Sequence, residues 1–100
     1  MSLCVQLRVA GGLLDLAKVM RVLKRHCVSH SKVAIGREGG REIATVHAIL
    51  DKRRSKRLAV ALERLPTVLE AVMFADGDFQ VTHYFAQPRE ALTTITREVQ

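Results

Sequence analysis

Residues 3–27 read LCVQLRVAGGLLDLAKVMRVLKRHC, and two successive hydrophobic patterns in this stretch decide the fold. Apolar residues first occupy alternate positions from Leu3 to Val9, which is the period of a half-buried strand. After Gly11 and Gly12 the spacing changes to three and four, which predicts an amphipathic helix from about residue 13 to residue 27. The apolar stripe of this helix is expected at Leu13, Leu16, Met20, Leu23 and Cys27.

A hairpin is predicted to follow this helix. Ser29 to Ser31 reads as a turn, and Lys32 to Gly36 as a short second strand. The loop at residues 37–41 contains paired glycines, which permit the positive φ that a tight connection needs. Glu42 to Leu50 is rich in β-branched residues and alanine, so we expect a third strand there.

A second helix and a fourth strand complete the pattern. Asp51 can cap the helix, which Pro66 ends. Its apolar stripe is expected at Leu58, Ala61, Leu62 and Leu65. Residues 69–75 alternate as a strand, which gives the order βαββαβ over residues 3–76. Two right-handed crossovers then predict an α+β, ferredoxin-like sandwich, with a four-stranded antiparallel sheet and two helices on one face.

Residues 77–100 are interpreted as a C-terminal extension to the domain of residues 3–76. Alternation from Phe79 to Phe85 indicates a fifth, edge strand. The polar segment 87–100, which contains Pro88, is expected to form a short helix or a tail.

Length and composition indicate one small domain with acidic partners. The chain has 100 residues, of which 48% are hydrophobic, and carries a formal net charge of +6. Its apolar runs are far shorter than the roughly 20 residues of a membrane span, so no membrane association is predicted. Two cysteines are too few for a disulfide framework, and no basic leader precedes an apolar segment. We therefore expect a cytoplasmic protein with reduced thiols.

The sequence predicts neither an enzyme nor a cofactor, because it contains no GxSxG, HExxH, Walker or GxGxxG motif. His26, Cys27 and His30 could bring a thiolate and two imidazoles to a zinc ion. The favoured interpretation is that Cys27 is the last core position of the helix and that no metal binds.

The densest charge feature is Lys52-Arg53-Arg54-Ser55-Lys56-Arg57. Cations near a helix N-terminus are mildly unfavourable, so we interpret Arg53, Arg54, Lys56 and Arg57 as binding residues for an acidic partner surface. Recognition of RNA by aromatic stacking is not expected, because the first and third strands lack Phe, Tyr and Trp. Nucleic-acid binding through the phosphate backbone stays open as an alternative.

Four short motifs resemble the ACT domain family. They are Gly11-Gly12-Leu13-Leu14 at the first turn, the basic helix Val19-Met20-Arg21-Val22-Leu23-Lys24-Arg25-His26, the pair Arg54-Ser55, and Leu62-Glu63-Arg64-Leu65-Pro66-Thr67-Val68. Within that family the chain is most similar to the short regulatory small subunit of acetolactate synthase, an enzyme of branched-chain amino-acid biosynthesis.

The resemblance implies a non-catalytic regulatory subunit. Such a subunit would form a homodimer and dock on the thiamine-diphosphate-dependent large subunit. Its amino-acid site, for an effector such as valine, would include Gly11, Gly12 and Leu13. A free-standing amino-acid-sensing ACT module of another pathway and a basic nucleic-acid-binding ferredoxin-like domain remain the alternatives.

Overall fold

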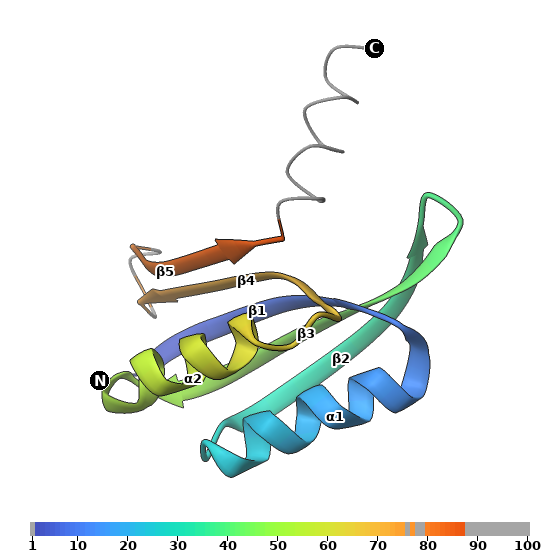
Figure 1. Cartoon of the computed structure of the whole chain (residues 1–100). Coiled ribbons are helices and arrows are strands. Elements are labelled where there is room, and N and C mark those ends of the chain that lie inside the picture. The colour runs from blue at the N-terminus through green and yellow to red at the C-terminus, as the bar shows by residue number, and fades with distance from the viewer. Residues whose placement is uncertain (1, 76, 78–79, 88–100) are drawn as a thin grey trace.

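Five strands and two helices make up the part of the chain that this computed structural model describes, residues 2–75, 77 and 80–87 (Figure 1). The strands are β1 (Ser2–Ala10), β2 (Ser29–Glu38), β3 (Arg41–Asp51), β4 (Val68–Ala75) and β5 (Val81–Ala86). The helices are α1 (Gly12–Arg25) and α2 (Ser55–Glu63), the second preceded by a 3₁₀ turn, η1 (Lys52–Arg54). A short helix or a tail was expected at residues 87–100. Of this segment the structure describes only Gln87.

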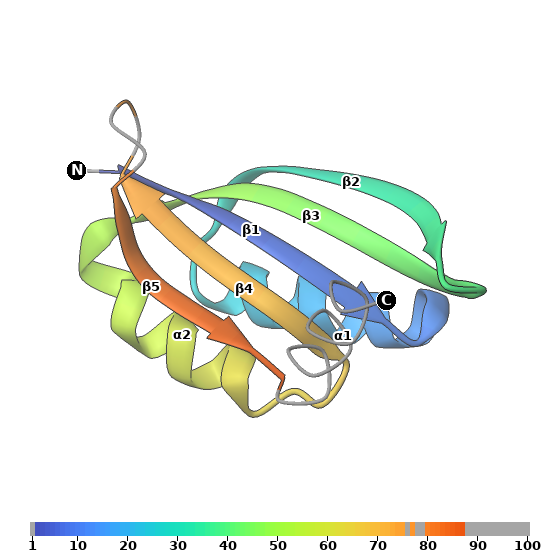
Figure 2. The same cartoon turned by 90° about the horizontal axis from the view of Figure 1, so that it is seen from above.

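The strands form one antiparallel sheet in the order β2-β3-β1-β4-β5, and Figure 2 shows both helices on the same face of it. The predicted α+β class is confirmed, and the arrangement is compatible with a ferredoxin-like sandwich. The sheet has five strands and not four, because the predicted edge strand joins it as β5, from Val81 to Ala86. β5 belongs to the sheet because it pairs with β4, and because Gln87 N donates a hydrogen bond to Leu69 O at 2.9 Å beyond the paired residues.

The core lies between the sheet and the helices. Along β1 the side chains of Leu3, Val5, Leu7 and Val9 are buried, which confirms the alternation read from the sequence. They pack with buried residues of β3, β4 and both helices: Val46, Leu50, Val19, Leu23, Leu58, Leu62, Val68 and Met73. In α2 the predicted stripe is confirmed at Leu58 and Leu62, which are fully buried, whereas Leu65 packs against the core from beyond the end of the helix and Ala61 is not part of the core.

The stripe of α1 differs from the prediction. Val19 and Leu23 are its buried residues, whereas the side chain of Leu13 is 72% exposed. Leu16 and Met20 are half-buried and pack against the core. Leu13 belongs to the first turn of the helix, whose buried residues begin only at Val19.

The end of α1 corrects two further predictions. Cys27 has φ 60°, its side chain is exposed, and it is not a core position. Val28 N donates to Leu23 O at 3.1 Å and Cys27 N to Lys24 O at 3.0 Å, which is the Schellman arrangement that ends a helix. The predicted turn at residues 29–31 is wrong as well, since β2 begins at Ser29 directly after this cap.

The connection from β3 to α2 contains the N-cap read from the sequence. Asp51 Oδ1 accepts a hydrogen bond from Arg53 N at 3.0 Å, so the cap opens η1 and not α2 itself. The hydroxyl of Ser55, which is buried, donates to Lys52 O at 2.7 Å. No helix in the described part of the chain is long and apolar enough to cross a membrane.

Candidate functional site

The end of α1 and the start of α2 lie at the same end of the sheet. β1 and β3 pair antiparallel, so that Ser2 at the start of β1 lies opposite Asp51 at the end of β3. Each strand is followed by a helix that runs back along it, and the two helices are therefore antiparallel to each other (Figure 1). This topology places the cap after α1 beside the basic run at the start of α2.

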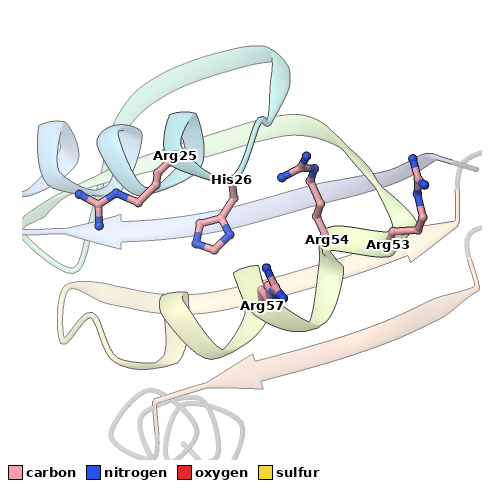
Figure 3. A pocket seen from close by; sticks show the side chains of 5 residues that line it. All are labelled: Arg25, His26, Arg53, Arg54 and Arg57. Carbon is pink, nitrogen blue, oxygen red and sulfur yellow. The ribbon is translucent and has the colours of Figure 1, made fainter.

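Between these two segments lies a hollow of about 480 Å³, here called the arginine hollow. Its lining residues are Arg25, His26, Arg53, Arg54 and Arg57. Figure 3 shows the side chains of His26, Arg54 and Arg57 near the gap between the two helices, with Arg25 and Arg53 at the two ends of the row. The lining contains four guanidinium groups and no carboxylate.

Within the part of the chain that the structure describes, most of this positive charge has no ion-pair partner. Arg53 Nη2 forms an ion pair with Asp51 Oδ2 at 3.3 Å, but the Arg53 side chain is still 90% exposed. Arg25, Arg54 and Arg57 form no ion pair with any acidic residue of the described chain. The arrangement can therefore hold an anion, because guanidinium groups donate paired hydrogen bonds to carboxylate and phosphate oxygens.

Asp51 contributes to the position of the basic run without lining the hollow. The hydrogen bond from Arg53 N, followed by that from the Arg53 side chain, lowers the pKa of the Asp51 carboxyl below its usual 3.8. The ionised carboxylate thus caps η1 at neutral pH and holds the backbone from which Arg53 and Arg54 project.

The structure divides the predicted partner-binding residues. It brings Arg53, Arg54 and Arg57 together in the arginine hollow, whereas Lys56 is exposed and does not line it. Arg25 and His26 were not among the predicted site residues, since they are distant from the basic run in sequence. The βαββαβ topology was the signal that could have placed them there.

The glycine turn, Gly11 and Gly12, joins β1 to α1 at the opposite end of α1. Both residues have positive φ, 100° and 83°, which glycine adopts without steric cost. A Cβ on Gly11 would lie 2.2 Å from Asp15 Oδ2, whereas one on Gly12 would meet nothing within 4 Å. Gly11 therefore carries the tighter requirement for a residue without a side chain.

A shallow apolar depression, here called the apolar notch, adjoins this turn. It is lined by Val9, Gly12, Leu13, Leu16, Ile35, Glu42 and Ala44, so Gly12 and Leu13 of the predicted ligand site line it and Gly11 does not. Its volume is about 10 Å³, which is room for about one water molecule. A single copy of the chain thus encloses no amino acid at this position.

The zinc hypothesis finds no cluster in the described residues, which contain no group of three or more His, Cys, Asp and Glu side chains placed around one ion. Cys4 and Cys27 are both free thiols. The side chain of His30, which that hypothesis also needs, lies outside what the structure describes.

No family model, curated protein or solved structure matches the chain.

Proposed function

We propose that the chain is a non-catalytic regulatory subunit with an ACT-like domain, similar to the small subunit of acetolactate synthase. The observation that carries the proposal is that Gly12 and Leu13 of the first turn line one depression together with Ile35 of the edge strand β2. A second copy of the chain is the proposed neighbour of this strand, and the catalytic large subunit is the proposed partner of the dimer.

The edge of β2 supports pairing with a second copy. Among the described residues β2 is the outermost strand of the sheet and pairs with β3 alone, so one side of it has no neighbouring strand there. Val33 and Ile35 lie opposite the buried Val46 and Ala44, hence on the helix-covered face, yet they are 43% and 54% exposed. Pairing of two β2 strands would satisfy the backbone and cover these side chains.

The same pairing would complete the proposed amino-acid site. Leu13, which is exposed, and Ile35 both line the apolar notch, so a strand added beside β2 would cover the notch from its open side. The backbone amides at the start of α1 would hold the carboxylate of the effector, since helix N-termini attract anions. An apolar effector side chain, such as that of valine, would contact Leu13 and Ile35 between the two copies.

The basic run is the proposed contact with the catalytic subunit. Its residues Arg53, Arg54, Lys56 and Arg57 are all exposed, and of these Lys56 alone does not line the arginine hollow. Exposed charges of this kind attract an acidic surface over a distance and orient it during encounter.

The proposal is tested by co-purification. The tagged full chain is expressed with the acetolactate synthase large subunit of the same organism, and the eluate is identified by mass spectrometry. We expect the large subunit in the eluate at low salt, together with a dimeric chain. A dimer that binds valine but never retains the large subunit would favour the free-standing sensing module instead. Binding to duplex DNA that weakens steeply with salt would favour the nucleic-acid alternative.

A further inference from the structure

The arginine hollow has the size of a small-ligand site. Its volume of about 480 Å³ lies within the range of roughly 300–1,000 Å³ that is typical of such sites. The lining comes from two separate elements, the end of α1 and the segment from η1 into α2. Both segments are fixed locally, the first by the cap at Cys27 and the second by Asp51 and Ser55.

The charge of the arginine hollow selects the ligand. Four arginines line it, and within the described chain only Arg53 has an acidic partner. A single carboxylate or a single phosphate would leave most of these cations unmatched. A ligand with several linked phosphate groups presents many acceptor oxygens within a short length, and the planar fork of arginine matches phosphate oxygens in pairs.

We propose that the arginine hollow binds a small molecule that carries two or more linked phosphate groups. The guanidinium groups of Arg54 and Arg57 contact the phosphates at the centre of the hollow, and His26 adds a ring N–H donor. Arg25 and Arg53, at the two ends of the row, allow a chain of phosphates to lie along it. A flat acidic protein surface would reach the rim of the hollow but would not fill it.

This site is separate from the proposed amino-acid site and does not depend on the regulatory function. The glycine turn precedes α1, whereas Arg25 and His26 end it. Binding to the arginine hollow therefore requires neither a second copy nor a catalytic subunit, and failure of either proposal would leave the other intact.

Isothermal titration of the full chain with sodium tripolyphosphate at low ionic strength tests the proposal. We expect one site per chain, tighter than that for sulfate. Arg54→Gln with Arg57→Gln should weaken binding at least about tenfold, because charge-assisted hydrogen bonds are lost. The control, Lys18→Gln with Arg21→Gln, removes the same charge from the exposed face of α1 and should change the affinity less than about threefold. Circular dichroism and urea unfolding establish that both variants fold.

Three outcomes would overturn the proposal. One is the absence of binding at millimolar tripolyphosphate. Another is equal weakening in the two double variants, which would mean that net charge alone attracts the anion. The third is that the chain binds a 20-base-pair DNA duplex tightly but does not bind tripolyphosphate, which would assign the basic surface to nucleic acid. Arg54→Lys with Arg57→Lys, which keeps the charge, should bind with intermediate affinity if the guanidinium fork matters.

Discussion

Arg25, the last residue of α1, and Arg57, in the first half of α2, line the same hollow. Their proximity follows from the antiparallel pairing of β1 with β3, which brings the end of one helix to the start of the next. At the other end of α1, the glycine turn lies beside the uncovered strand β2. The two ends of one helix thus belong to two different candidate sites.

The first prediction concerns the glycine turn. Gly11→Ala should lower the free energy of unfolding by about 1–2 kcal/mol, because a Cβ disfavours this positive φ and would crowd Asp15. Gly36→Ala is the matched control, since a Cβ in that part of β2 meets nothing within 4 Å. It should leave stability unchanged or raise it by up to about 1 kcal/mol. Urea unfolding measures both, and equal stability of the two variants would contradict the strained turn.

The second prediction concerns Tyr84, the one tyrosine of the chain. Its hydroxyl donates a hydrogen bond to Glu70 Oε2 at 3.1 Å. Partial burial, and then the adjacent carboxylate, raise the pKa of Tyr84 above 10. Because folding raises this pKa, the protonated Tyr84 contributes to the free energy of unfolding. This contribution is complete below pH 10 and is lost as the pH rises through the pKa of the folded state.

Ultraviolet titration of the phenolate reads this pKa directly. Glu70→Gln should lower the midpoint towards 10 without reaching it, because the burial remains. Glu42→Gln, an exposed carboxylate on β3, is the control and should leave the midpoint where it is. A midpoint that is the same for all three proteins would show that Glu70 does not act on Tyr84.

The third prediction concerns the edge of β2. Ile35→Lys should convert the dimer to a monomer at tens of micromolar chain, because an ammonium group would be buried between the paired strands. Val60→Lys is the control. The side chain of Val60 is 48% exposed, close to the 54% of Ile35, but it lies on α2 and away from the edge of β2. Sedimentation equilibrium distinguishes the two, and a wild-type chain that is monomeric under these conditions would contradict the pairing.

The fourth prediction concerns the exposed part of the basic run. Arg53→Glu with Lys56→Glu should slow association with the catalytic subunit by about tenfold at low salt, because exposed charges act mainly on the rate of encounter. The difference should shrink at high salt, where screening shortens the range of the charges. Lys18→Glu with Arg21→Glu makes the same change of charge on α1. If that variant slows association equally, net charge and not the basic run controls docking.

Strand β1 could be predicted from the sequence because its burial alternates along its whole length. Leu3, Val5, Leu7 and Val9 all point into the core, and no competing pattern fits them. The buried face of α1 was harder to predict, because Leu13 and Val19 both fit an apolar stripe. Only the packing of the helix against the sheet shows that Val19 is buried and Leu13 is not. The exposure of Cys27 could not be read from the sequence, because the αL position of a helix cap usually carries glycine.

The candidate sites were predictable only where their residues are close in sequence. The glycine turn and the basic run are both continuous segments, and each could be identified directly. Arg25 and His26 enter the arginine hollow through the sheet topology, so their contribution required the arrangement of β1 and β3 in space. The edge strand β5 was indicated by its alternation, but its register against β4 required the backbone pairing.

The rate of acetolactate formation by the catalytic subunit, measured while the full chain is titrated in, tests the proposed function most directly. If the chain is the regulatory subunit, the rate changes saturably with chain concentration, and valine alters the plateau in the wild type but not in Gly12→Val. A rate that stays constant at chain concentrations far above that of the enzyme, with no complex detected by sedimentation, would contradict the account.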